Sequence, residues 1–166
     1  DWTVHLMDTG LTTSTGGGIK RLESWLNSGN FLMTYGDGVC NVDLRDLLRF
    51  HQAQGRIATV TAVRPPARYG GLIFDGDLIA SFTEKPQIGE GWINGGFMVF
   101  EPEIFDHFDG AEDSILEVDL LSHLAREGEL VGYRHRGFWQ CLATIRDKNR
   151  LQELWDSGDA PWKVWE

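Results

Sequence analysis

The chain has 166 residues, 42% hydrophobic and 24% charged, which is the size and composition of one globular domain, and no apolar run is long enough to cross a bilayer. Its net charge of −10 argues against a nucleic-acid or anionic-membrane surface but not against a small phosphorylated ligand held by local cations. Two cysteines, Cys40 and Cys141, give neither a disulfide framework nor a paired metal motif, which fits a reducing cytoplasm.

Hydrophobic periodicity and turn residues predict alternating strands and helices along the chain. In the first part of the chain we expect a strand at 4–7, a loop at 8–18, a helix at 19–26, a strand at 31–35 and a helix between Asp43 and Gly55. A strand at 57–63, a hairpin at 72–82 and a strand at 92–100 should follow. The last part should contain helices at 102–108 and 115–127, a strand at 130–135 and a final helix after 144. This order predicts an α/β fold with a mixed, mainly parallel sheet flanked by helices, in a single domain over residues 1–166.

Two of these helices carry local signals that bear on the search for a site. His51 shares the inner face of its helix with Leu47, so we interpret it as a buried helix residue rather than a catalytic base. Thr144 and Asp147 have the spacing of a capping box at the start of the last helix.

The turn Gly36-Asp37-Gly38 follows an apolar strand, where an acidic side chain can stand at the carboxyl edge of a sheet. Flanking glycines allow the phosphates of a ligand to approach the backbone, and a carboxylate there suits Mg²⁺. Taken alone, the same residues are more typical of a polar turn after a core strand.

Two glycine-rich stretches are weaker signals. The loop at 8–18 is rich in Thr and Gly and could hold phosphates through backbone amides, but it is neither a P-loop nor a dinucleotide fingerprint. Asn94-Gly-Gly96 interrupts the apolar run 92–100, which indicates close approach of a ligand or of another backbone.

Four stretches together resemble the sugar-1-phosphate nucleotidylyltransferases: Tyr35-Gly-Asp-Gly-Val39, Pro65-Pro-Ala-Arg-Tyr-Gly70, Phe82-Thr-Glu-Lys-Pro86 and Ile93-Asn-Gly-Gly-Phe97. Glu-Lys-Pro with Asn-Gly-Gly is specific for this superfamily. The cytidylyl branch is favoured by Asp8-Thr-Gly10, Thr15-Gly-Gly17, Gly137-Phe-Trp-Gln140 and the aromatic Ala160-Pro-Trp-Lys163. The resemblance covers the chain end to end and implies the Rossmann-like fold of nucleotide-diphospho-sugar transferases.

The resemblance implies a nucleotidyl transfer in which glucose 1-phosphate attacks the α-phosphorus of CTP, so that CDP-glucose forms and pyrophosphate leaves. It implies Mg²⁺ as cofactor, small-molecule partners and a cytoplasmic, homo-oligomeric enzyme of surface-polysaccharide supply. By this resemblance, Asp37 is the metal ligand, and Asp37 and Lys85 are the catalytic residues. The residues implied at the nucleotide are Thr9, Gly10, Gly17, Gly36 and Asp37. Those implied at the sugar phosphate are Glu84, Lys85, Asn94, Gly95 and Trp139. Each also has a purely structural explanation when taken singly.

Three departures from the family pattern bear on activity. The Gly-rich triphosphate loop of the family would precede Asp1, so we expect the chain to represent the C-terminal two-thirds of the domain. Ala143 stands where the pattern Trp-Gln-x-x-Asp-Thr places a second metal-binding carboxylate, and Gly18 stands where the family has arginine. We therefore expect little catalysis by this chain alone. The alternatives are an inactive sugar-nucleotide-binding remnant and, less favoured because Asp37-Gly-Val39 lacks a second acid, a sugar transferase of similar fold.

Overall fold

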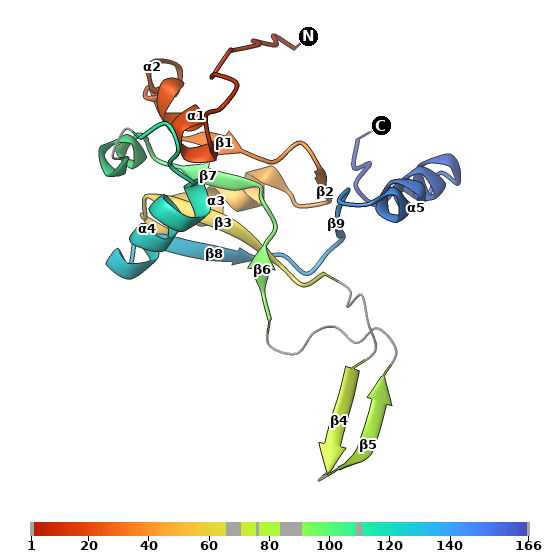
Figure 1. The fold of residues 1–166 in the computed structure, drawn as a ribbon. Helices are drawn as coiled ribbons and strands as arrows, with labels where there is room; N and C mark the ends of the chain where they lie inside the picture. Colours follow the sequence, from red (N-terminus) through yellow and green to blue (C-terminus); the bar gives the residue numbers. More distant parts are fainter. Residues whose placement is uncertain (1, 66–70, 76, 84–90, 109–110, 166) are drawn as a thin grey trace. The chain divides into compact units, whose positions relative to one another are not determined.

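A computed structural model describes residues 2–65, 71–75, 77–83, 91–108 and 111–165 of the chain (Figure 1). The chain forms two compact units. The first unit comprises Asp1–Met33, Leu48–Thr59 and Met98–Val131; the second comprises Thr34–Leu47, Val60–Phe97 and Gly132–Glu166. The expectation of a single domain stays a prediction.

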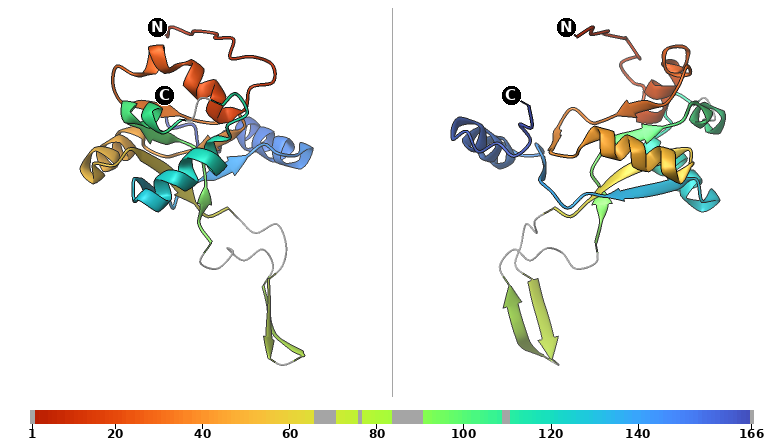
Figure 2. Two further views of the ribbon diagram at one scale, coloured as in Figure 1. Left: turned by 60° about the vertical axis from the view of Figure 1, so that its left-hand side comes forward. Right: turned by 180° about the vertical axis from the view of Figure 1, so that it is seen from behind.

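Short strands form the buried centre of the first unit. β1 (Phe31–Met33) pairs antiparallel with β7 (Met98–Phe100), beside which it lies in every view (Figures 1 and 2). β7 also pairs antiparallel with the first two residues of β3 (Ala58–Val63). All three residues of β7 are fully buried, which explains why this stretch contains only large apolar side chains.

Helices surround these strands. They are α1 (Thr15–Arg21), α2 (Glu23–Leu26), most of α3 (Leu44–Gln54), the 3₁₀ helix η1 (Pro102–His107), the π-helix η2 (Leu116–Leu121) and α4 (Ser122–Glu127). His51 of α3 is fully buried, as expected, and its Nδ1 and Nε2 lie 2.8 Å from Thr59 Oγ1 and 3.1 Å from Glu101 Oε1. This histidine thus joins a helix to two strand ends.

The expected helix at 115–127 is continuous but not uniform. Its first part, η2, is a π-helix. Side chains satisfy the amides at its start: Asp119 Oδ2 accepts from Ile115 N–H at 2.6 Å, and Thr15 Oγ1 accepts from Leu116 N–H at 3.0 Å. α4 then ends at Gly128, whose φ is +75°.

Strand pairs and one helix make up the second unit. The last residues of β3 pair antiparallel with β6 (Ile93–Asn94), and β2 (Gly38–Cys40) pairs antiparallel with β9 (Trp139–Cys141). β4 (Gly71–Asp75) and β5 (Leu78–Thr83) form the expected hairpin. The last helix is α5 (Ile145–Asp156). Trp162 of the aromatic C-terminal stretch packs on Phe138, with ring centroids 5.5 Å apart.

The expected mixed sheet with flanking helices is confirmed, although parallel pairing has a smaller share than expected. β8 (Leu130–Arg134) pairs with β3 and runs in the same direction, because Ala58 N–H donates to Glu129 O and His135 N–H donates to Ala62 O. The other pairings with a defined register among the described residues are antiparallel.

Two expectations near the start of the chain are wrong. Residues 4–7 form no strand, and Leu6 is 94% exposed, because nothing in the described part of the chain pairs with this segment. The loop predicted to reach Gly18 ends earlier, since α1 begins at Thr15. Among the helices of the described residues, none combines the length and the hydropathy needed to cross a bilayer.

Candidate functional site

The turn that carries Asp37 lies at the start of the β2–β9 ladder in the second unit. In this ladder Gly38 is opposite Cys141, and the carbonyl of Asp37 accepts a hydrogen bond from Leu142 N–H at 2.7 Å. Asp37 is exposed and Ala143 follows Leu142 directly. The structure thus brings together, at one end of this ladder, the two positions that the sequence singled out as a metal-binding pair.

The Asn94-Gly95-Gly96 segment leaves β6 in a tight turn. Asn94 Oδ1 accepts from Gly96 N–H at 2.9 Å, and Gly95 N–H donates to Thr61 O at 2.8 Å. A Cβ atom on Gly95 would lie 2.7 Å from Val63 Cγ1 and 3.0 Å from Thr61 O. The glycine is therefore needed for the close approach of β3, as the interruption of the apolar run indicated.

Left-handed backbone follows directly after this turn. Gly96 has φ +74° and Phe97 has φ +47°, which is uncommon for a side chain of that size. Thr61 Oγ1 donates to Phe97 O at 2.7 Å and fixes the strained residue. Such strain is often found at functional sites. A Cβ on Gly96 would lie 3.2 Å from Tyr35 Cδ2, so the ring of Tyr35 packs against this segment.

Trp139 joins the two segments. It lies opposite Cys40 in the β2–β9 ladder, and its indole N–H donates to Gly95 O at 2.8 Å. The structure therefore gathers Gly36, Asp37, Asn94, Gly95 and Trp139 in the second unit. We call these five residues, with Ala143, the candidate site.

The capping box at the start of α5 is confirmed and fixes the chain next to Ala143. Thr144 Oγ1 accepts from Asp147 N–H at 3.2 Å and donates to Asp147 Oδ2 at 2.8 Å. Gln140 Nε2 donates to the other carboxylate oxygen, Asp147 Oδ1, at 3.2 Å. Both carboxylate oxygens of Asp147 thus already accept hydrogen bonds at the start of α5.

An arginine cluster in the same unit was not predicted. The guanidinium groups of Arg64, Arg134 and Arg136 lie 5.0, 6.0 and 5.9 Å from the ring centroid of Trp92. Trp92 comes just before β6, which ends at Asn94. The two arginines of Arg134-His-Arg136 are close together in the sequence, but only the fold places them near Arg64. In a chain of net charge −10, such a cluster provides local attraction for an anion.

The threonine- and glycine-rich segment lies in the first unit. Gly10 has φ +93° and its N–H donates to Asp8 Oδ1, while Arg21 donates to the carbonyl of Thr9. Gly17 is inside α1, and its N–H donates to Ser114 O at 3.2 Å.

A packing reason for glycine at position 17 is clear, because a Cβ there would lie 2.5 Å from Glu112 O. Nucleotide contacts for Thr9, Gly10 and Gly17 stay predictions. Glu84 and Lys85, the expected sugar-phosphate residues, lie outside the described residues.

Comparison with known proteins relates these features to a family. Residues 12–153 match the family model described as nucleotidyl transferase. A glucose-1-phosphate cytidylyltransferase of Salmonella typhi is 44% identical over 166 residues, which cover 99% of this chain and 64% of that protein. A Bacillus subtilis protein named "Probable glucose-1-phosphate cytidylyltransferase" is 36% identical over 164 residues, with the same coverage. The chain thus spans somewhat less than two-thirds of the length of these relatives.

A solved structure supports the same fold. HddC from Yersinia pseudotuberculosis superposes with a TM-score of 0.65 at 21% identity, over 88% of this chain and 64% of that protein.

Proposed function

Because this chain belongs to the nucleotidyl transferase family, we propose that it is part of a glucose-1-phosphate cytidylyltransferase, an enzyme that forms CDP-glucose from CTP and glucose 1-phosphate. The observation that carries the proposal is the assembly of the Asp37 turn, the Asn94–Gly95 turn and Trp139 in one unit by direct contacts. These segments also carried the resemblance in the sequence.

The proposed reaction is a single displacement at phosphorus. A phosphate oxygen of glucose 1-phosphate forms a bond to the α-phosphorus of CTP, and the bond from that phosphorus to the bridging oxygen breaks. Pyrophosphate leaves with the electron pair. Because no covalent intermediate with the protein is needed, the contribution of the chain is to position the substrates and to offset negative charge.

The candidate site supplies polar groups of the right kind for a sugar. Asn94 Oδ1 is already bonded to Gly96 N–H, so the amide NH₂ is the group that would donate to a sugar hydroxyl. Trp139, held by its bond to Gly95, would form a wall of the sugar site. Two sources of positive charge would attract the phosphates: Lys85, as the family motif implies, and the arginine cluster around Trp92.

The donor set at Asp37 fits a Mg²⁺ ion held mainly by substrate phosphates, because such ions often take only one or two protein carboxylates. Mg²⁺ bound there would neutralise phosphate charge. Among the described residues, Asp37 belongs to no group of three or more side chains that could hold a metal ion together. Ala143 is the position from which a second carboxylate would come.

Ala143 also supports a second candidate function, an inactive sugar-nucleotide-binding remnant. A chain with one metal-binding carboxylate would keep the contacts of the candidate site to the sugar but bind a free triphosphate weakly. Under either proposal, the biological setting is a cytoplasmic supply of nucleotide sugar for lipopolysaccharide O-antigen, with a homo-oligomer as the proposed assembly.

Calorimetric titration of the chain with CDP-glucose, and separately with CTP and Mg²⁺, tests the proposal. We expect CDP-glucose to bind, and Asn94→Ala to weaken its affinity by about tenfold through the lost hydrogen bond. Asn149→Ala, on the exposed surface of α5, is the matched control. Absence of CDP-glucose binding, or equal affinity in both variants, would contradict the proposed site. Binding of CDP-glucose without CTP favours the remnant, and binding of both favours the enzyme.

The exchange Ala143→Asp tests the metal assignment. We expect it to raise Mg²⁺ affinity in the presence of CTP and, in a protein of the full length of the relatives, to raise Mg²⁺-dependent release of pyrophosphate. Ala143→Asn, which adds a side chain of similar size without charge, is the control. If the aspartate variant behaves as the asparagine variant does, the second ligand has been placed wrongly.

A further inference from the structure

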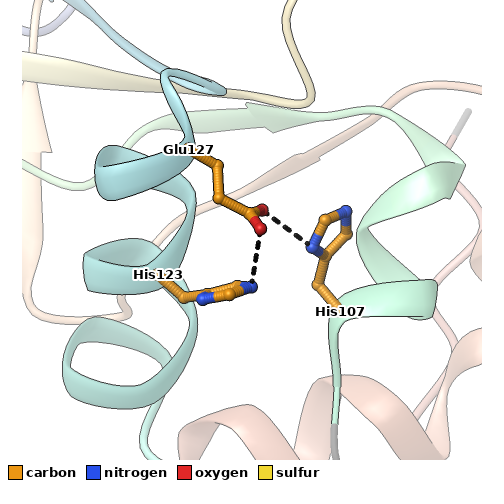
Figure 3. A group of neighbouring side chains, drawn as sticks. All are labelled: His107, His123 and Glu127. Atoms are coloured by element: carbon orange, nitrogen blue, oxygen red, sulfur yellow. Dashed lines mark ion pairs between the residues drawn. The ribbon is translucent and has the colours of Figure 1, made fainter.

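Three side chains with metal-binding groups meet in the first unit, apart from every residue used above. His107 is the last residue of η1, while His123 and Glu127 are four residues apart on α4 and so lie on one face of it (Figure 3). His107 Nδ1 lies 3.4 Å from Glu127 Oε2, and His123 Nε2 lies 3.3 Å from Glu127 Oε1. Both imidazole rings therefore direct a nitrogen atom toward the same carboxylate.

The spacing of these atoms suits a small metal ion. One ligand atom from each residue can be chosen so that all three lie within 4.8 Å of one another. In a tetrahedral zinc site with bonds of about 2.0–2.1 Å, neighbouring ligand atoms lie about 3.4 Å apart. Each imidazole nitrogen already lies at about this distance from one oxygen of the carboxylate, His107 Nδ1 from Oε2 and His123 Nε2 from Oε1, so a small closure of the three side chains would complete the site.

We propose that His107, His123 and Glu127 bind a divalent transition-metal ion of the Zn²⁺ type. Two imidazole nitrogens and one carboxylate oxygen are ligands that such ions prefer, whereas Mg²⁺ prefers oxygen ligands alone. The proposed zinc site is therefore chemically distinct from the Mg²⁺ expected at Asp37.

Ions can reach the cluster, and there is room for further ligands. The side chains of His123 and Glu127 are 42% and 43% exposed. The two histidines also line a hollow of about 190 Å³ with Phe108, Ser114, Asp119 and Leu120. Water in this hollow can complete the coordination. Asp119 itself is engaged, since its Oδ2 accepts from Ile115 N–H, and we do not assign it as a ligand.

Local structure supports a built arrangement rather than a chance meeting of surface charges. η2, a π-helix of six residues, leads directly into α4, and π-helical turns occur frequently at functional sites. An exposed ion pair by itself contributes little to stability. A metal ion would instead join η1 to α4 and would stabilise the first unit by mass action.

Zinc titration of the full chain tests the proposal in buffer with millimolar Mg²⁺, so that binding at Asp37 does not interfere. A chromophoric chelator that competes for Zn²⁺ reports the affinity. We expect His107→Gln and His123→Gln each to weaken binding by about tenfold or more, because the loss of even an indirect partner of a metal ligand costs this much. His5→Gln, which removes an exposed histidine whose ring contacts Trp25, should leave the affinity unchanged.

Nuclear magnetic resonance of the unmutated chain keeps the test independent of how the variants fold. Addition of Zn²⁺ should shift the imidazole signals of His107 and His123 and leave those of His5 in place. Failure of the chain to compete with the chelator, an equal zinc affinity in all three variants, or shifts confined to other histidines would each overturn the proposal.

Discussion

Exchange of Gly95 for alanine separates the packing role of this residue from its predicted role at the sugar. The added Cβ would lie 2.7 and 2.9 Å from the two methyl groups of Val63, where carbon atoms normally rest about 3.5–4.0 Å apart. Val63 is 1% exposed and Thr61 O belongs to the backbone of β3, so neither can move outward without loss of packing.

Overpacking of this kind costs about 1–3 kcal/mol. For a chain of this length, a cost of about 2 kcal/mol lowers the melting temperature by roughly 4–8 °C. Circular dichroism during heating measures the shift. Gly132→Ala is the matched control, because its Cβ would meet only Ala62 Cβ at 3.8 Å, and it should melt no lower than the unmutated chain. A Gly95→Ala protein that melts within about 1 °C of the control would refute the packing argument.

Three further expectations follow. Thr144→Ala should lower the free energy of unfolding by about 1 kcal/mol through loss of the cap on α5, as measured by urea denaturation, and Thr144→Ser should restore most of it. Gly18→Ala should raise the free energy of unfolding by about 0.5–1 kcal/mol, because position 18 is inside α1 and the nearest atom to a Cβ is 3.7 Å away; a loss would contradict this. Burial raises the pKa of the Cys40 thiol, so alkylation by iodoacetamide should need a higher pH than for a small free thiol. Because the pKa of this thiol is higher in the folded than in the unfolded chain, the unfolded chain loses the proton first as the pH rises. The stability that the protonated thiol contributes is therefore lost at alkaline pH.

Hydrophobic periodicity predicted the helices and strands that are long or that are bounded by a glycine or a capping residue. α3 ends at Gly55, whose φ is +58°, and the capping box at Thr144 starts α5 as expected. The failures have physical causes. The apolar run 92–100 was predicted as one strand, but it is broken into β6 and β7 because Thr61 holds Gly96 and Phe97 in left-handed backbone. The interruption at Asn94-Gly-Gly96 indicated a close approach of some kind, but not that Thr61 makes it.

Asp37 and Asn94 were singled out because they stand next to glycines at strand ends, and Trp139 because of the family resemblance; their roles at a substrate stay predictions. The sequence singled out Asp37, Asn94 and Trp139, and the structure joins their segments through Gly95 and Leu142. The arginine cluster and the meeting of His107 with α4 were missed, because each combines residues from distant segments that carry no motif. Such sites depend on tertiary packing, which spacing along the chain does not encode.

The position of Ala143 has a genetic consequence. It is exposed between β9 and the cap of α5, so a change of side chain there is expected to alter stability by no more than about 0.5 kcal/mol. A change of the second base turns two of the four alanine codons into aspartate codons and the other two into glutamate codons. A carboxylate at this place can therefore be gained or lost in a single mutational step that selection for folding does not oppose, and only selection on the activity itself would keep it.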